Sequence, residues 1–195
     1  MDISKVISLV DTKKNLNGTT VIGIDGLAGS GKSTLASKLA SIVSDVQIVE
    51  LDHFYKSIKF PNSLLIEAVY DAYFDWQRLI KEVLVPLSMN EESCFGKMDW
   101  ETGIMVGSEP IKSGGVVIVE GVYAMRPEIR CFYDLKLYVE TPKTLRKSRI
   151  DNRKYPDESW VSYWMDLEDW YFNNQSPYSY VDLVINGDQS PINWA

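Results

Sequence analysis

Residues 26–33 read Gly-Leu-Ala-Gly-Ser-Gly-Lys-Ser, and a threonine follows at position 34. This stretch matches the pattern G-x-x-x-x-G-K-[ST] in full. A β-prone run at 20–25 precedes it, and apolar residues at helical spacing follow it. Glycines let the backbone curl so that several amides point at one anion, and the start of a helix adds a partial positive charge. The stretch therefore predicts a P-loop, which binds the phosphates of a nucleoside triphosphate.

The residue types of this loop also predict the cofactors. Lys32 is expected to reach the β- and γ-phosphates, and the Ser33 hydroxyl is expected to ligate Mg²⁺. We therefore expect ATP and Mg²⁺ as cofactors. The predicted nucleotide-binding residues of the loop are Gly26, Ala28, Gly29, Ser30, Gly31, Lys32, Ser33 and Thr34.

Outward from the loop, apolar runs of strand length alternate with stretches of helical period. The expected strands lie at 20–25, 46–51, 116–119, 135–139 and 181–185, and a helix is expected at 75–87. Strands separated by helices predict an α/β, P-loop NTPase fold, with a doubly wound parallel sheet flanked by helices. Residues 93–113 are expected to form a small hairpin-like insertion, and residues 143–158 a lid. A chain of 195 residues, 45% of them hydrophobic, suits one domain over 1–195.

Two acidic residues follow strands of the predicted sheet. Asp52 comes directly after the second strand, and Glu120 directly after the run at 116–119. Because ligands of open α/β sheets gather at the carboxyl ends of the strands, we expect both acids near the γ-phosphate. One can serve the metal, and the other can accept a proton from an attacking hydroxyl. His53, the single histidine, is the second choice as a base, since the strand register directs it away from Asp52.

Charge and composition narrow the class of partner. The net charge is −7, and residues 155–195 hold seven acids and no Lys or Arg. Residues 143–154 form a basic island with six Lys or Arg and one Asp, a size that suits one polyphosphate, although a solvated helix face would look the same. We therefore expect neither nucleic acid nor a membrane as a partner. Two cysteines and one histidine argue against a zinc site or a disulfide framework and favour the cytoplasm.

These residues resemble the uridine kinase and phosphoribulokinase family of P-loop kinases. The resemblance spans about residues 19–187 and rests on the segments 26–34, 52–55, 74–76, 120–122, 134–141 and 180–185. It implies that Asp52 is the catalytic base and that Ser33 and Glu120 manage Mg²⁺. It also implies that arginines of the basic island close over the phosphates, with Arg146 at the nucleotide and Arg149 and Arg153 beside Lys32 in catalysis. The implied acceptor-binding residues are Asp52, Tyr55, Asp75 and Trp100.

The hairpin region departs from the family. Uridine kinases usually carry a tyrosine and, five residues later, a histidine that grip the base, whereas residues 98–103 read Met-Asp-Trp-Glu-Thr-Gly. We therefore predict that uridine is a poor acceptor. The expected function is an ATP-dependent small-molecule kinase that phosphorylates a hydroxyl, most simply on a nucleoside. The alternatives are another acceptor, such as pantothenate or a sugar, and a non-catalytic nucleotide-binding regulator. The sequence leaves a homo-oligomer open.

Overall fold

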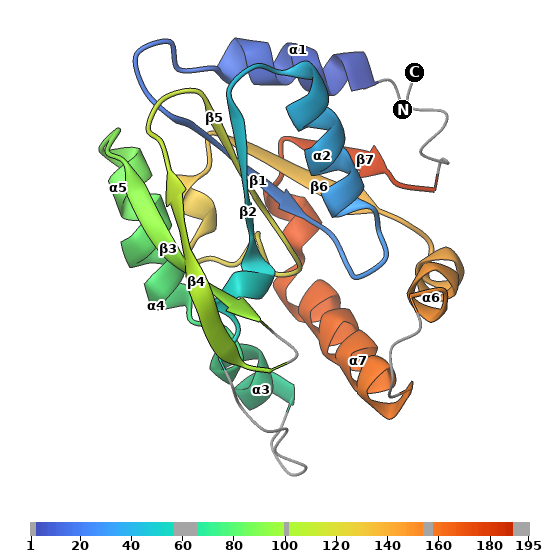
Figure 1. The fold of residues 1–195 in the computed structure, drawn as a ribbon. Coiled ribbons are helices and arrows are strands. Elements are labelled where there is room, and N and C mark those ends of the chain that lie inside the picture. Colours follow the sequence, from blue (N-terminus) through green and yellow to red (C-terminus); the bar gives the residue numbers. More distant parts are fainter. Residues whose placement is uncertain (1–2, 57–65, 100–101, 154–157, 189–195) are drawn as a thin grey trace.

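A five-stranded parallel sheet forms the centre of the computed structural model, which describes residues 3–56, 66–99, 102–153 and 158–188 (Figure 1). The strands lie in the order β2-β5-β1-β6-β7. Their bounds are Thr20–Asp25 for β1, Val46–Glu50 for β2, Val116–Glu120 for β5, Leu135–Glu140 for β6 and Leu183–Asn186 for β7. All four pairings between neighbours are parallel. The doubly wound P-loop NTPase fold predicted from the sequence is confirmed.

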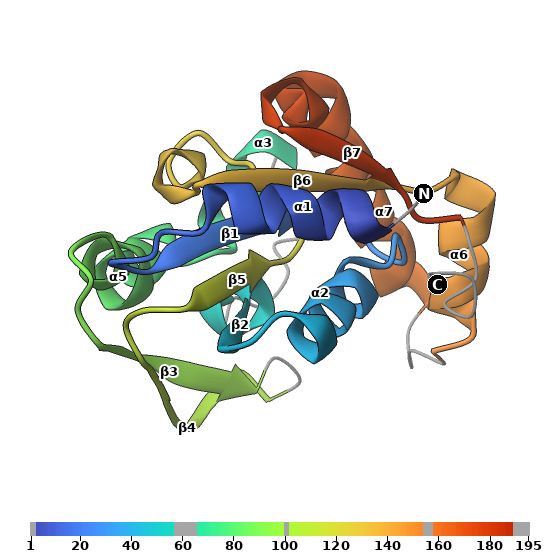
Figure 2. The same ribbon diagram turned by 90° about the horizontal axis from the view of Figure 1, so that it is seen from above.

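Helices connect the strands and cover both faces of the sheet (Figure 2). Their bounds are Ile3–Lys13 for α1, Lys32–Ile42 for α2, Ile66–Ala72 for α3, Trp76–Leu79 for α4, Val85–Ser88 for α5, Lys143–Asp151 for α6 and Glu158–Gln175 for α7. A π-helical turn at Ile80–Leu84 joins α4 to α5, so that the two continue one another as the helix expected at 75–87.

Successive residues of the central strands point to opposite faces, which gives two separate cores. Ile22 and Ile118 face α1 and α2, while Val21 and Val117 belong to the core on the side of α3, α4, α5 and α7. The apolar run at 116–119 is fully buried because both faces of β5 are covered. This arrangement leaves the carboxyl ends of β1, β2 and β5 as the edge of the sheet where polar side chains gather.

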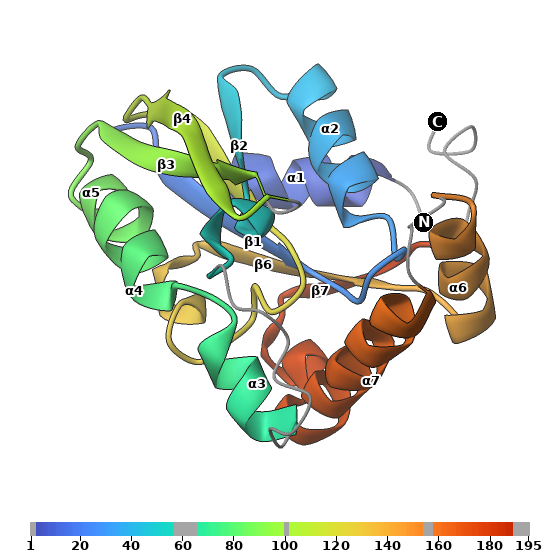
Figure 3. The ribbon, with the colours of Figure 1, turned by 60° about the horizontal axis from the view of Figure 1, so that its bottom comes forward.

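An antiparallel hairpin interrupts the alternation of parallel strands and helices, as the sequence predicts for residues 93–113. Its strands are β3 (Ser93–Asp99) and β4 (Ile104–Ile111), and the register shifts between Lys97 and Met98. β3 packs against the π-helical turn and against the 3₁₀ turn Leu51–Phe54 that follows β2, so that the hairpin lies beside α4 and α5 (Figure 3). Trp100, the acceptor residue predicted for this region, lies outside the described residues.

Helix α7 carries a stripe of aromatic and aliphatic side chains that packs into the core. Trp164, Leu167 and Tyr171 are buried in the core on the α3 side of the sheet, and Tyr163 and Trp170 pack against it. None of the helices in the described part of the chain is long and apolar enough to span a membrane.

Candidate functional site

The P-loop connects the end of β1 to the start of α2. Gly31 precedes the helix with a left-handed backbone at φ 105°, and no side chain caps the helix there. Because the first amides of a helix have no acceptor within it, these amides are open to an anion. Gly29 is required for a second reason, since a Cβ there would lie 2.7 Å from the carbonyl oxygen of Arg146. The loop therefore has the shape of an anion site and packs directly on α6.

A single pocket joins the loop to the ends of β2 and β5. Lys32 lies within it, only 8% exposed, and its Nζ donates a hydrogen bond to the carbonyl oxygen of Leu27 at 3.3 Å. The predicted loop residues that line the same pocket are Ala28, Gly29, Gly31, Lys32, Ser33 and Thr34. Gly26 and Ser30 lie in the body of the loop, where Ser30 donates its amide to Leu27.

The two predicted acids line this pocket together with a third, Glu50. Glu50 and Glu120 are register partners on the adjacent strands β2 and β5. Asp52 follows two residues after Glu50, in the 3₁₀ turn Leu51–Phe54. Glu120 is buried and shares a hydrogen bond with the Ser33 side chain, whereas Asp52 is exposed in the pocket. Glu50 is not among the residues predicted from the sequence, although its place at the end of β2 could have indicated it.

The surrounding protein makes Asp52 and Glu120 more basic than ordinary carboxylates. Loss of water raises the pKa of both groups, of Glu120 because its side chain is buried and of Asp52 because the walls of the pocket surround it, although its surface is open to the cavity. The positive charge of Lys32 opposes this rise in each. Glu50 raises both further, because like charges disfavour ionisation. A carboxylate with a raised pKa accepts a proton more readily, as a general base must.

The donor set suits Mg²⁺. A magnesium ion at a nucleotide needs only one or two protein ligands, because phosphates and waters supply the rest. The Ser33 hydroxyl and the Glu120 carboxylate, already hydrogen-bonded to each other, offer such a pair of oxygens. Within the described residues, no group of three or more His, Cys, Asp or Glu side chains is placed so that it could hold a metal ion by itself.

Beneath the loop lies a buried carboxylate, Asp25, that the sequence analysis did not single out. It is the last residue of β1 and is fully buried. Its Oδ1 accepts the amide of Gly26 at 2.6 Å, and its Oδ2 accepts the amide of Met125 at 2.8 Å and the hydroxyl of Tyr171 at 2.5 Å. Burial raises the pKa of this group, and these three donors oppose the rise. Asp25 therefore organises the start of the P-loop.

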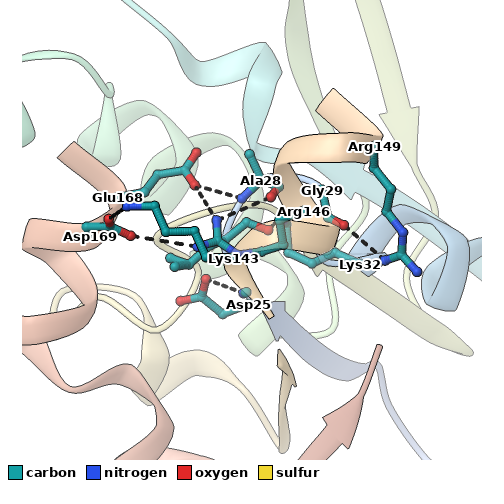
Figure 4. A network of polar contacts seen from close by, with 11 residues as sticks. Asp25, Ala28, Gly29, Lys32, Lys143, Arg146, Arg149, Glu168 and Asp169 are labelled. Carbon is teal, nitrogen blue, oxygen red and sulfur yellow. Dashed lines mark hydrogen bonds and ion pairs between the residues drawn. The ribbon is translucent and has the colours of Figure 1, made fainter. Parts of the chain in front are cut away.

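The arginines of the basic island occupy different places, and Figure 4 shows two of them, Arg146 and Arg149, beside the P-loop. Arg146 is buried, and its guanidinium lies 3.5 Å from the carbonyl oxygen of Ala28 and 3.8 Å from Glu168. Arg149 donates hydrogen bonds to the carbonyl oxygens of Gly29, Ser30 and Gly187. Arg153 follows the end of α6 and lines the nucleotide pocket. Of these three arginines only Arg153 lines the pocket, while Arg146 and Arg149 contact carbonyl oxygens of the P-loop.

Glu168 is a second buried acid that sequence reasoning missed. It lies on α7, lines the pocket, and accepts the amide of Ala28 at 2.7 Å. Burial raises its pKa to about 7, although Lys32, the Ala28 amide and Arg146 oppose the rise. The sequence shows it only as one of the acids of residues 155–195. Glu168 directly follows Leu167 and lies three residues before Tyr171, and this position beside two core residues of a helix could have indicated that it faces inward.

The structure places some of the predicted acceptor residues in the pocket and others outside it. Tyr55 lines the pocket and contacts Trp164 edge-on, with ring centroids 5.6 Å apart. Asp75 instead precedes α4 and accepts the amide of Arg78 at 3.1 Å, which makes it a helix cap. His53 places Nδ1 3.2 Å from the carbonyl oxygen of Met98 in the hairpin.

Residues 21–154 match the model of the phosphoribulokinase / uridine kinase family. The chain belongs to this family. A uridine kinase of Borrelia garinii subsp. bavariensis is 29% identical over 181 residues, which cover 85% of each chain.

Two solved structures share the fold of this family member. A "possible uridine kinase" from Bacillus stearothermophilus superposes with a TM-score of 0.68 at 22% identity, covering 93% of this chain and 99% of its own. A candidate fructose transport system kinase from Silicibacter sp. TM1040 gives 0.67 at 20% identity, covering 94% and 98%. The relatives named as kinases and the P-loop fold support a phosphotransferase, with the acceptor left open.

Proposed function

We propose that the protein transfers the γ-phosphoryl group of MgATP to a hydroxyl of a small molecule. One observation carries this proposal: a single pocket holds the P-loop residues Lys32 and Ser33 opposite two carboxylates of raised pKa, Asp52 and Glu120. A nucleotide switch needs phosphate and metal ligands, but it has no need of a further basic carboxylate beside an open cavity. The extra acid favours a kinase over a non-catalytic regulator.

The proposed reaction assigns a task to each group. The acceptor oxygen forms a bond to the γ-phosphorus, while the bond between that phosphorus and the β,γ-bridging oxygen breaks and ADP leaves. Asp52 takes the proton of the acceptor hydroxyl. Lys32 and the amides at the start of α2 bind the phosphate oxygens and balance their charge. Ser33 and Glu120 would hold Mg²⁺, which supplies further charge neutralisation when bound.

The part of the pocket lining that lies outside the P-loop indicates the kind of acceptor. Besides the carboxylates and Arg153, the lining beyond the loop consists of Gly121 and of apolar or aromatic side chains: Tyr55, Val122, Ile150, Val161, Trp164 and Met165. A flat ring can pack on such a wall, while the acids favour a neutral or cationic compound over a phosphorylated one. We propose a nucleoside as the acceptor that fits this wall, with pantothenate or a sugar as the alternative.

An ADP-release assay over a panel of nucleosides, sugars and vitamins tests the proposal. We expect one class of hydroxyl compound to stimulate ADP release by the wild-type protein. Asp52→Asn keeps the shape and removes the proton acceptor, so turnover should fall ~10²–10⁴-fold, the usual loss of a general base, while MgATP still binds. Near-wild-type turnover of Asp52→Asn, or loss of MgATP binding instead, would show that Asp52 is not the base.

A further inference from the structure

One face of helix α7 reaches the P-loop through two polar side chains, Glu168 directly and Tyr171 through Asp25. Glu168 and Tyr171 are three residues apart, so that they lie on the same side of the helix. Both are buried, at 4% and 0% exposure. The buried face of α7 therefore carries two side chains, Glu168 and Tyr171, whose polar atoms form hydrogen bonds with other parts of the protein.

These two side chains fix two amides of the P-loop, one directly and one through Asp25. The Oε2 atom of Glu168 accepts the amide of Ala28 at 2.7 Å. The hydroxyl of Tyr171 donates to Asp25 at 2.5 Å, and Asp25 in turn accepts the amide of Gly26 at 2.6 Å. Helix α7 therefore fixes the first half of the loop at both of these amides.

The contacts divide the loop amides into two groups. The amides of Gly26, Ala28 and Ser30 each have an acceptor within the protein. The amides at the start of α2 lie where a helix provides no acceptor, and they are the ones that phosphate can use. A loop whose first half is held by the protein pays less conformational cost when phosphate binds to its second half.

We propose that Glu168 and Tyr171 are positioning residues for nucleotide binding, which hold the first half of the P-loop in the shape that the phosphates require. This inference rests on the proposed binding of MgATP. Neither residue needs to touch the nucleotide; each acts through a loop amide or through Asp25.

The charges around Glu168 decide how its carboxylate can remain beside a phosphate site. Arg146 of α6 lies 3.8 Å from Glu168, and Lys32 of α2 also favours its ionised form. Asp169, the neighbour on α7, opposes ionisation but pairs with Arg146 at 3.7 Å and with Lys143 at 2.5 Å. The cations of α2 and α6 therefore offset the negative charge that Glu168 brings to the loop (Figure 4).

The test measures MgATP affinity by competition with a fluorescently labelled ATP. Glu168→Met keeps the volume and removes the acceptor of the Ala28 amide. Tyr171→Phe removes only the hydroxyl, and Glu168→Gln keeps an acceptor oxygen at the same place. Matched controls are Asp166→Asn, an exposed acid on the same helix, and Tyr178→Phe, a tyrosine that is 47% exposed. Thermal melting shows that each variant is folded.

We expect Glu168→Met to weaken MgATP binding by about 10-fold or more, the factor for losing one hydrogen bond to a charged group. Tyr171→Phe should weaken it by at least about 3-fold, and the controls should change it less than about 2-fold. Glu168→Gln should recover most of the affinity lost in Glu168→Met, which a role in packing alone would not produce.

Three results would overturn the inference. Unchanged affinity in both Glu168→Met and Tyr171→Phe would show that α7 does not position the loop. Tighter binding in Glu168→Met would show that the carboxylate competes with phosphate for the Ala28 amide. Failure of the wild-type protein to bind MgATP would refute both the proposed function and the positioning role that rests on it. Binding of MgATP without turnover of any acceptor would refute only the kinase reaction, and the affinities of the variants would still decide whether Glu168 and Tyr171 position the loop.

Discussion

Replacing Glu168 with glutamine should change the pH dependence of folding stability. Burial raises the pKa of Glu168 from 4.5 to about 7. The folded protein therefore binds a proton at Glu168 more tightly than the unfolded chain does, so this group stabilises the fold in its protonated form. That contribution is fully present below the unfolded pKa of 4.5 and is lost as the pH rises through about 7.

The size of the effect follows from the two pKa values. A difference of one pKa unit corresponds to about 1.4 kcal/mol, so a rise from 4.5 to about 7 corresponds to ~3 kcal/mol in total. Between about pH 5 and about pH 8 the wild type should lose ~2–3 kcal/mol of stability through this group. Glutamine does not titrate, so Glu168→Gln should not show this loss.

Chemical denaturation of both proteins at the two pH values provides the measurement. The stability of Glu168→Gln relative to wild type should increase from about pH 5 to about pH 8 by ~2 kcal/mol or more. Asp166→Asn, which removes an exposed acid from the same helix, should show no comparable change. If the stability of Glu168→Gln relative to wild type did not change with pH, or decreased as the pH rises, burial would not raise the pKa of Glu168 as described.

Three further predictions concern the nucleotide and the acceptor. Lys32→Ala should strongly lower ADP production with little change in the melting temperature, and unchanged production would contradict the role of Lys32. MgATP should protect residues 143–154 from hydrogen exchange if this basic island is a lid; protection that stays the same would favour a solvated helix face. Uridine should be a poor acceptor because Met98 and Gly103 cannot supply the missing hydrogen bonds to its base, each worth ~1–3 kcal/mol when left unpaired; kcat/KM for uridine or cytidine at or above ~10⁴ M⁻¹s⁻¹ would show that this prediction is wrong.

Local patterns were sufficient to predict the frame of the site. The P-loop is a contiguous motif, and the strands are apolar runs whose period or continuity reports burial. Asp52 and Glu120 could be selected because each directly follows such a run, and parallel strands end at the same edge of a sheet.

The second set of polar groups could not be predicted in the same way. The contact between Glu168 and Ala28 joins residues 140 positions apart, and the contact between Tyr171 and Asp25 joins residues 146 apart. Composition places Glu168 in an acidic run, where a solvated position is the usual outcome. Nor does the spacing of Arg146 and Arg149 distinguish a guanidinium that binds loop carbonyls from one that faces a ligand. The identity of these partners depends on how α6 and α7 pack on the loop.

Transfer of radiolabel from γ-labelled ATP shows whether the γ-phosphoryl group moves to a small-molecule hydroxyl. With an acceptor selected by the ADP assay, the wild-type protein should place the label on that acceptor in proportion to the ADP formed. Asp52→Asn, incubated under the same conditions, should form the labelled product ~10²–10⁴-fold more slowly. Label that appears only as inorganic phosphate, or that remains on ATP with every acceptor of the panel, would show that the protein is not a kinase of small-molecule hydroxyls.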